Sequence, residues 1–178
     1  GVDKSALEVT VCEVLLGQVR TLDAILKVEQ GDYDLLPANP DLTAAEVELM
    51  QASNREQRLQ ERLTAARDSY DFVLIDCPPS LNILTLNALI AADGVLIPMQ
   101  CEYFALEGLT ALVTTIKKIR ETLNPRLRIE GLLRTMFDGR NSLANEVSDQ
   151  LREHFGDKVF RTLIPRNVRL AEAPSYGK

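Results

Sequence analysis

Apolar residues in this chain fall into short continuous runs that alternate with longer, helically spaced segments. Five runs predict strands, at residues 33–38, 71–76, 94–100, 127–137 and 158–167. Several runs are apolar at consecutive positions, as in FVLI and VLI, and this pattern is typical of parallel strands that are covered on both faces.

Helical segments occupy most of the sequence between these runs, at residues 41–51, 53–71, 80–92, 105–125 and 142–156. Ser80 is a candidate N-cap, and Gly156 is the candidate C-cap of the last helix. The alternation predicts an α/β fold, with one domain over residues 1–178 in which helices flank a mostly parallel sheet. The closing AEAPSYGK, residues 171–178, is predicted to be a loop.

Ligands of such sheets bind at the carboxyl ends of the strands. In this chain those ends are residues 76–80, 98–102, 134–140 and 165–169. The side chains with unusual chemistry are concentrated in these four segments, which together form the candidate functional site.

Asp76 ends the run FVLI and is followed by Cys77, Pro78, Pro79 and Ser80. A carboxylate in this place can hold a water of a magnesium ion that binds phosphate oxygens, or it can be a turn or helix-cap aspartate. The two prolines fix φ and remove two backbone donors. Such a stiff loop fits a ligand-sensing segment and also fits a rigid turn.

The next two strand ends have structural as well as functional interpretations. Glu102 and Glu107 are explained by capping and solvation near the helix over 105–125, and Phe104 is expected to contact the core. Arg134 ends an apolar strand and is predicted to face the ligand crevice. Met136 is expected in the core or in a pocket wall.

Three arginines lie in the last two loops: Arg140 follows an Asp-Gly turn, and Arg166 and Arg169 follow Pro165. They form one phosphate-binding cluster if the loops are neighbours. The alternative is that each is a solvated surface residue, since such arginines are common on loops. Residues 1–114 carry 7 Lys or Arg against 18 Asp or Glu, whereas residues 115–178 carry 13 against 8. A chain of net charge −6 can therefore still present a basic surface.

Composition argues against several classes of protein. We expect neither a membrane span nor a signal peptide. Cys12, Cys77 and Cys101 are far apart without a CxxC pair, which argues against a disulfide framework or a zinc site and for a reducing cytoplasm. His154 is the only histidine and is expected on the surface near a helix end.

Four segments together resemble one known family. They are YDFVLIDCPPSL, QCEYFALEGL, TMFDGRNSLANEV and IPRNVRLAEAPSYGK, and their order and spacing are similar to those of the ParA/Soj partitioning ATPases. This family belongs to the deviant-Walker-A group of P-loop proteins, which also contains MinD. The resemblance implies a P-loop NTPase fold of the SIMIBI type.

The resemblance implies a role for each matching position. Asp76 matches the Walker B aspartate, which acts in catalysis and organises Mg²⁺ through water, and Cys77 to Ser80 match the switch that follows. The adenine pocket for ATP is implied at Met136, Pro165 and Arg166. Contacts to DNA without sequence preference are implied at Arg140 and Arg169, whereas no definite role is implied for Glu102 or Glu107.

The family resemblance also implies partners. ATP closes a homodimer, the dimer binds double-stranded DNA of the nucleoid in the cytoplasm, and a ParB/Spo0J-type centromere-binding protein stimulates hydrolysis. No membrane partner is implied.

The family's phosphate loop, of the KGGxGKT type, has no match, because no GK[ST] sequence occurs in the chain. GVDKSALEV resembles the segment after that loop, and SYGK precedes the family's last helix. We therefore expect an internal fragment of a longer parent protein, incomplete at both termini. Alone, it should neither bind ATP tightly nor hydrolyse it. Unpaired backbone at the Asp76 strand should make it unstable or prone to association and domain swapping.

Alternatives with the same fold remain open. One is a MinD-like or other cargo-positioning ATPase, and another is a non-catalytic DNA-binding regulator that has lost the phosphate loop. An iron–sulfur reductase would need cluster-bridging cysteines, whereas Cys77 and Cys101 are more simply explained as small apolar residues near strand ends. The IPRNVRLAEAPS loop favours the partitioning family.

Overall fold

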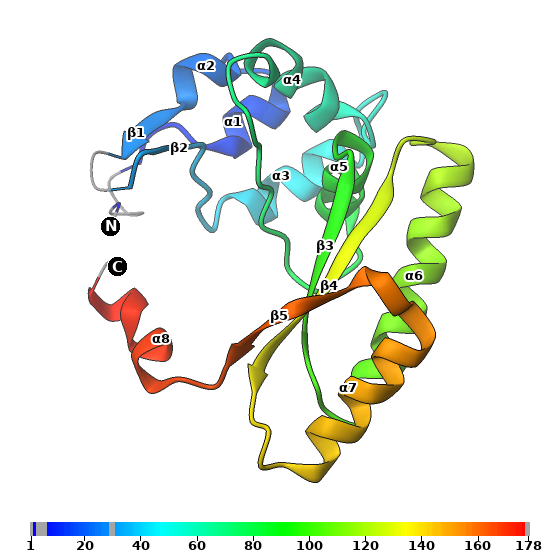
Figure 1. Ribbon diagram of the computed structural model, residues 1–178. Helices are drawn as coiled ribbons and strands as arrows, with labels where there is room; N and C mark the ends of the chain where they lie inside the picture. The colour runs from blue at the N-terminus through cyan, green and yellow to red at the C-terminus, as the bar shows by residue number, and fades with distance from the viewer. Residues whose placement is uncertain (1, 3–6, 29–30, 177–178) are drawn as a thin grey trace. The chain divides into compact units, whose positions relative to one another are not determined.

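The computed structural model describes residues 2, 7–28 and 31–176, and the chain divides into two compact units, Gly1–Ala92 and Asp93–Lys178 (Figure 1). The segments GVDKSALEV and SYGK lie partly outside the described residues. The single domain over residues 1–178 stays a prediction.

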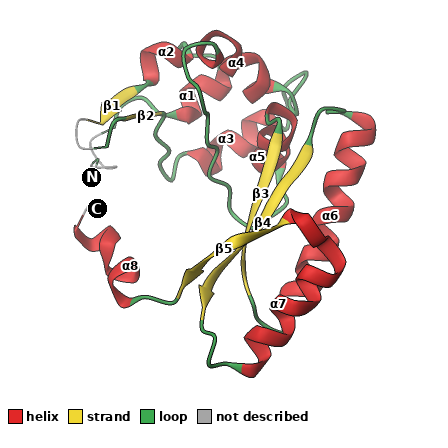
Figure 2. Ribbon diagram, viewed as in Figure 1, coloured by secondary structure: helices red, strands yellow, loops and turns green. Residues whose placement is uncertain are grey.

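The first unit is mainly helical (Figure 2). It contains α1 (Val11–Leu16), α2 (Thr21–Ala24), β1 (Leu26–Val28), β2 (Tyr33–Leu35), α3 (Leu42–Leu49), α4 (Arg58–Arg67) and α5 (Ile83–Ala91). β1 and β2 form an antiparallel hairpin with Leu26 opposite Leu35. The helices predicted at 41–51, 53–71 and 80–92 are confirmed in shortened form, and the strand predicted at 33–38 ends before Pro37.

Apolar faces of the helices form the core of this unit, where Leu15, Leu49, Leu59 and Ala88 are buried together. The buried side chain of Asn87 forms hydrogen bonds that connect α5 to the start of α4. Its Oδ1 accepts a hydrogen bond from Leu59 N at 3.0 Å, and its Nδ2 donates to Arg55 O at 2.7 Å. Because the first N–H groups of a helix have no intrahelical partner, this side chain on α5 fixes the start of α4.

The N-cap of α5 is Asn82, so the prediction of Ser80 is wrong. Asn82 Oδ1 accepts a hydrogen bond from Thr85 N at 3.0 Å, while the Thr85 hydroxyl donates to Ser80 O at 2.7 Å. Asn and Ser are comparable N-caps, so the sequence pattern could not choose between them. Ser80 lies before the helix and is tied to its first turn by its carbonyl group.

The strand predicted at 71–76 is also wrong. Residues 72–78 form an irregular segment that belongs to no strand in the described part of the molecule. Phe72 and Leu74 are 87% and 92% exposed, and Ile75 packs against the first unit's core. The β-propensity of FVLI is a preference for a pleated surface between neighbouring strands, and without such a neighbour these residues do not form a strand.

The second unit is a three-stranded parallel sheet with strand order β3-β4-β5. Its elements are β3 (Gly94–Gln100), α6 (Ala105–Thr122), β4 (Arg128–Phe137), α7 (Ser142–Phe155), η2 (Gly156–Lys158), β5 (Val159–Pro165), α8 (Val168–Glu172) and η3 (Ala173–Tyr176). Both pairs of strands are parallel. The three strands and two long helices confirm the predicted α/β class, whereas the loop predicted at 171–178 begins as the end of α8 and continues into η3.

Asn141 and Gly156 fix the ends of α7. Asn141 is its N-cap, with Oδ1 accepting a hydrogen bond from Leu143 N at 3.0 Å. Gly156 follows the helix with φ +50°, a conformation that favours glycine, and it confirms the predicted C-cap. The glycine signal in the sequence therefore places the end of the helix correctly, and the structure adds the N-cap.

Arg134 lies in the core, so the prediction that it faces a ligand crevice is wrong. Its side chain is 1% exposed and enters the space between β4, β5 and α7. Nη1 donates to Ser148 Oγ at 2.9 Å, and Nη2 donates to Phe160 O at 2.9 Å and Arg161 O at 3.2 Å. Burial, and next the charge of Arg152, lower the pKa of this guanidinium. A buried cation held by neutral acceptors cross-links the three elements, and alternation along β4 explains why it points inward.

Arg134→Ala should destabilise the second unit by about 3 kcal/mol, because Ser148 and two carbonyl groups lose their buried donors. The free energy of unfolding can be measured by hydrogen exchange of the β5 and α7 amides. Arg128→Ala, on an exposed position of the same strand, is the matched control and should cost less than about 1 kcal/mol. Equal losses for the two variants would contradict the cross-linking role.

Candidate functional site

The carboxyl ends of β3, β4 and β5 lie at one edge of the second unit's sheet. Gln100 is opposite Thr135, and Phe137 is opposite Pro165. Arg166 N donates to Phe137 O at 3.1 Å and so continues the contact past the end of β5. Three of the four predicted strand-end segments therefore meet at this edge, and the fourth, residues 76–80, belongs to the first unit.

Met136 has an unusual backbone near this edge. Its φ is +51°, which is uncommon for a residue with a side chain, and its side chain is 40% exposed. The register between β4 and β5 shifts between Arg134 and Phe137. Irregularities of this kind re-aim side chains beside functional sites. The geometry fits a pocket wall rather than a core position, and the adenine contact of Met136, Pro165 and Arg166 stays a prediction.

Arg140 lies in a tight loop after β4 and is held there by Asp138. Its Nε donates to Asp138 Oδ1 at 2.9 Å, and its Nη2 donates to Asp138 Oδ2 at 2.7 Å. The Arg140 backbone N–H also donates to Asp138 Oδ1, at 3.1 Å, which makes the loop an Asx turn. The hydrogen bonds from Arg140, together with the charge of Arg166, lower the pKa of Asp138 to about 2.

The two arginine-bearing loops are neighbours, which meets the condition for a single cluster. The hydrogen bond from Arg166 N to Phe137 O joins them, and the charge of Arg166 adds slightly to the lowering of the Asp138 pKa. Arg169 lies in the first turn of α8, where its N–H donates to Asn167 Oδ1 at 2.8 Å. The guanidinium groups of Arg166 and Arg169 have no ion-pair or hydrogen-bond partner within the described residues.

Two aromatic rings are exposed where β3 ends. Tyr103 and Phe104 are 73% and 74% exposed, and their rings meet edge to face with centroids 5.1 Å apart. The expected core contact of Phe104 is therefore wrong, because this loop carries the ring outward before α6 begins. Glu107 lies in the first turn of α6, where its charge is favourable near the helix N-terminus.

Asp76 is exposed, and its carboxylate has no ion pair or hydrogen bond within the described residues. Desolvation, and next the charge of Asp76, raise the pKa of the adjoining Cys77 thiol, so this cysteine is not an activated nucleophile. No cluster of three or more His, Cys, Asp or Glu exists among the described residues. Because Mg²⁺ usually combines one or two carboxylates with waters and phosphates, Asp76 suits that role, but the chain contains no matching phosphate loop.

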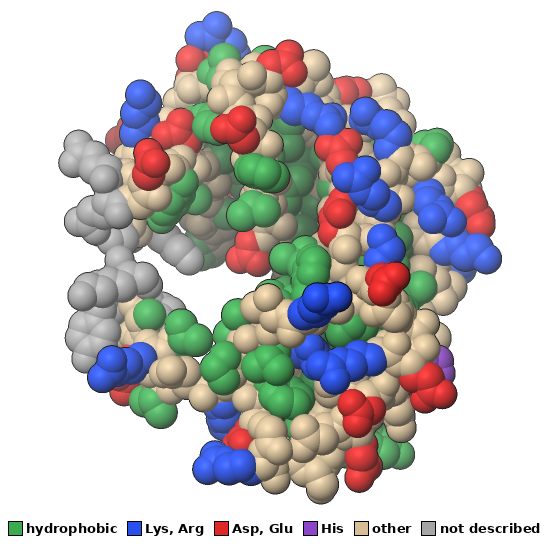
Figure 3. All heavy atoms as spheres, in the orientation of Figure 1, with side chains coloured by type: hydrophobic (Ala, Val, Ile, Leu, Met, Phe, Trp, Pro, Cys, Tyr) green, Lys and Arg blue, Asp and Glu red, His purple; other side chains and the backbone are tan. Residues whose placement is uncertain are grey.

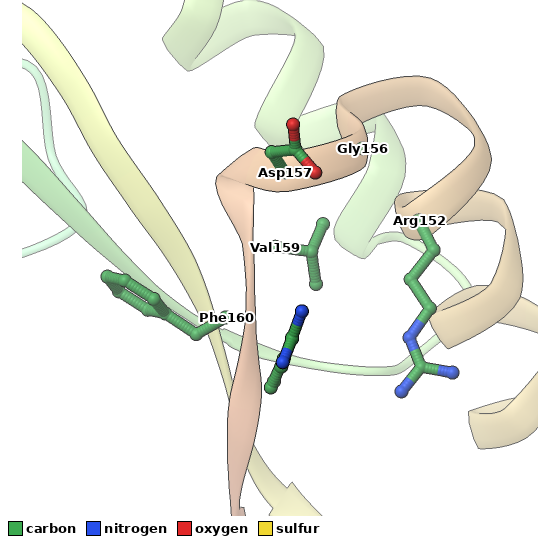
Figure 4. A pocket seen from close by; sticks show the side chains of 6 residues that line it. Arg152, Gly156, Asp157, Val159 and Phe160 are labelled. Carbon is green, nitrogen blue, oxygen red and sulfur yellow. The ribbon is translucent and has the colours of Figure 1, made fainter.

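A hollow of about 510 Å³ lies at the other end of β5 (Figure 4). It is lined by Arg152, Gly156, Asp157, Val159, Phe160 and Arg161. Because β5 begins at Val159, this hollow lies away from the carboxyl ends of the strands. It contains none of the residues that the sequence assigned to a site.

Basic side chains do not form one continuous surface on the face seen in Figure 3, where Lys and Arg lie among Asp and Glu. The pair Arg140–Asp138 is an example from the candidate site. Sequence reasoning treated Asp138 only as a turn residue and missed its contact with Arg140. The signal in the sequence was the placement of Asp138 and Arg140 on either side of Gly139, which allows their side chains to meet across a tight turn.

No helix within the described part of the chain is both long and apolar enough to span a membrane.

Comparisons with known proteins agree on one family. The model of a family described as "AAA domain" matches residues 1–129. An uncharacterised protein of Pseudomonas putida is 60% identical over 99% of this chain and 67% of its own length. The chromosome partitioning protein ParA of Caulobacter vibrioides is 51% identical over 100% of the chain and 67% of its own length. The sporulation initiation inhibitor protein Soj of Bacillus subtilis is 46% identical over 100% of the chain and 70% of its length.

Solved structures share the fold. Cobyrinic acid a,c-diamide synthase from Mycobacterium smegmatis, with an ATP analogue and magnesium bound, matches with a TM-score of 0.86 and 35% identity, over 100% of this chain and 78% of that one. The McdA(D38A)–ATP complex from Cyanothece matches with a TM-score of 0.86 and 20% identity, over 99% of this chain and 69% of that one, which supports the fold alone. On the strength of the partitioning relatives, the chain belongs to the ParA/Soj family of chromosome-partitioning ATPases.

Proposed function

We propose that this chain is the central part of a partitioning ATPase that forms a homodimer with ATP and Mg²⁺, binds double-stranded DNA without sequence preference and is stimulated by a ParB-type partner. The observation that carries the DNA-binding part is the meeting of two arginine-bearing loops at one sheet edge. The similarity to ParA and Soj over the whole chain supports the partitioning role.

The nucleotide part of the proposal starts from Asp76. Its free, exposed carboxylate suits a water-mediated contact to Mg²⁺, and the bound ATP analogue and magnesium in a relative 35% identical support those ligands. When bound, Mg²⁺ would neutralise charge on the phosphates. Cys77 to Ser80 connect Asp76 to α5, because the Ser80 carbonyl oxygen accepts a hydrogen bond from the Thr85 hydroxyl group. A movement of this switch segment would therefore be transmitted to the start of α5.

The DNA part rests on exposed guanidinium groups. Arg140 has a side chain that is 91% exposed, and Arg166 and Arg169 follow on the adjoining loop. Arginines that contact phosphate oxygens position a protein on a duplex without reading its bases. Binding of this kind depends on neutralising phosphates and weakens steeply with salt. The nucleoid would be the natural location of such a protein.

The MinD-like and cargo-positioning alternatives share the nucleotide chemistry but not the need for DNA contacts at Arg140 and Arg169. A non-catalytic regulator would share the DNA contacts but not the hydrolysis. DNA binding and ATP turnover therefore separate the three possibilities.

Calorimetric titration of this 178-residue chain with Mg-ATP should show a Kd weaker than about 1 mM, because a single carboxylate without a phosphate loop cannot hold the triphosphate. A longer form of the protein that carries a KGGxGKT segment would be the positive control. A micromolar Kd for this chain alone would contradict the proposal.

Asp76→Ala in the parent protein should lower ATP turnover by roughly 100-fold or more, because the carboxylate that organises Mg²⁺ is lost. Asp71→Ala is the matched control, since Asp71 is an exposed aspartate in the same segment, and it should keep near-normal turnover. Steady-state phosphate release measures both variants. Near-normal turnover of Asp76→Ala would reject the metal assignment.

Arg140→Ala and Arg169→Ala in the parent protein should each weaken duplex binding, to background at physiological salt, while ATP binding is unchanged. Each lost phosphate contact should also reduce the slope of log affinity against log salt by about one, where residual binding can be measured. Arg128→Ala, at the opposite end of β4, is the matched control and should bind normally. Unchanged retention of DNA by either loop variant at low salt would count against the proposal.

A further inference from the structure

We propose that the Asp138 carboxylate competes with DNA phosphate groups for the Arg140 guanidinium. In the free protein Asp138 binds this guanidinium and so limits the affinity of the protein for DNA. This inference rests on the proposed function, because it concerns the same DNA contact. It assigns to the loop after β4 a second role, which is to set the strength of the contact.

The geometry of the pair supports competition. Arg140 uses Nε and Nη2 to bind the two carboxylate oxygens of Asp138, at 2.9 and 2.7 Å. Two parallel N–H···O bonds of this kind are also how arginine grips a phosphate group. The carboxylate therefore occupies the edge of the guanidinium that a bidentate phosphate contact would need.

Asp138 is the fixed member of this pair and Arg140 is the movable one. The Asp138 side chain is 34% exposed, whereas that of Arg140 is 91% exposed. Asp138 Oδ1 also accepts the Arg140 backbone N–H, and Asn141 N donates to Asp138 O at 3.0 Å. The backbone of the loop thus holds the carboxylate in place, while the guanidinium has room to turn toward a ligand.

The carboxylate stays charged under any condition in which DNA would bind. Its pKa of about 2 reflects hydrogen bonds from Arg140 first and the charge of Arg166 last. Asp138 therefore meets Arg140 as an anion. A phosphate that approaches Arg140 meets a negative charge that partly cancels the positive one.

Competition by an exposed ion pair should be modest, because such pairs are weak and are screened by salt. Arg140 would exchange one anionic partner for another when DNA binds. The Asp138 carboxylate left behind would then take up a cation from solution, which offsets part of the counterion release that favours binding. DNA binding would therefore be weaker, and would depend less on salt, than it would be if all three arginines were free of an acidic partner.

Asp138→Asn tests this inference in the parent protein, with a fluorescent duplex of random sequence as the probe. Asparagine keeps the Oδ1 acceptor of the Asx turn, removes the charge and replaces the Oδ2 acceptor with an NH2 group. Duplex affinity should rise by roughly threefold, and the salt slope should steepen by up to about one. Asp138→Ala should tighten binding as well, which separates the charge effect from any effect of the new amide.

Two controls locate the effect. Asp157→Asn makes the same change in net charge at the opposite end of β5 and should alter affinity less than Asp138→Asn does. In an Arg140→Ala background, measured at low salt, Asp138→Asn should lose most of its effect. If the unsubstituted protein binds DNA but Asp138→Asn binds equally or more weakly, the carboxylate positions Arg140 instead, and the inference is overturned. If the unsubstituted protein does not bind DNA, the proposed function itself fails.

Discussion

The parallel pairing of β4 with β5 is the constraint on which the candidate DNA surface depends. It sets Phe137 opposite Pro165, and the hydrogen bond from Arg166 to Phe137 extends it into the loops. At the other end of β5, the Arg134 guanidinium holds the carbonyl groups of Phe160 and Arg161 from within the core. Buried backbone contacts and one buried cation therefore decide where the exposed arginines lie.

At this edge of the sheet, the availability of an arginine for phosphate depends on whether it is paired with an acidic side chain, and not on the total number of charges. Arg140 is counted as a positive charge in the sequence, but its guanidinium is already bonded to Asp138. Arg166 and Arg169 differ from it, because their guanidinium groups have no partner in the part of the chain that the structure describes. A basic C-terminal third therefore does not imply that every arginine in it is equally free to bind a phosphate.

The segment around Asp76 shows the limit of local propensity. FVLI has the composition of a buried strand, yet Phe72 and Leu74 are exposed, and only Ile75 packs against the first unit's core. A strand is defined by hydrogen bonds to a neighbour, and composition cannot supply that neighbour. The carboxylate of Asp76 nevertheless lies on an exposed loop that leads to α5, as its proposed contact with Mg²⁺ requires.

Local signals in the sequence were enough to determine the parallel strands β3 to β5, the helices between them and the cap of α7 at Gly156, because each depends on short-range periodicity and turn chemistry. The family was also predictable, since its motifs are continuous in sequence. Tertiary structure alone decided that Arg134 points into the core, that Phe104 is exposed and that Asp138 holds Arg140. These features depend on which face of an element meets a neighbour and on the path of a loop, and spacing along the chain does not specify either.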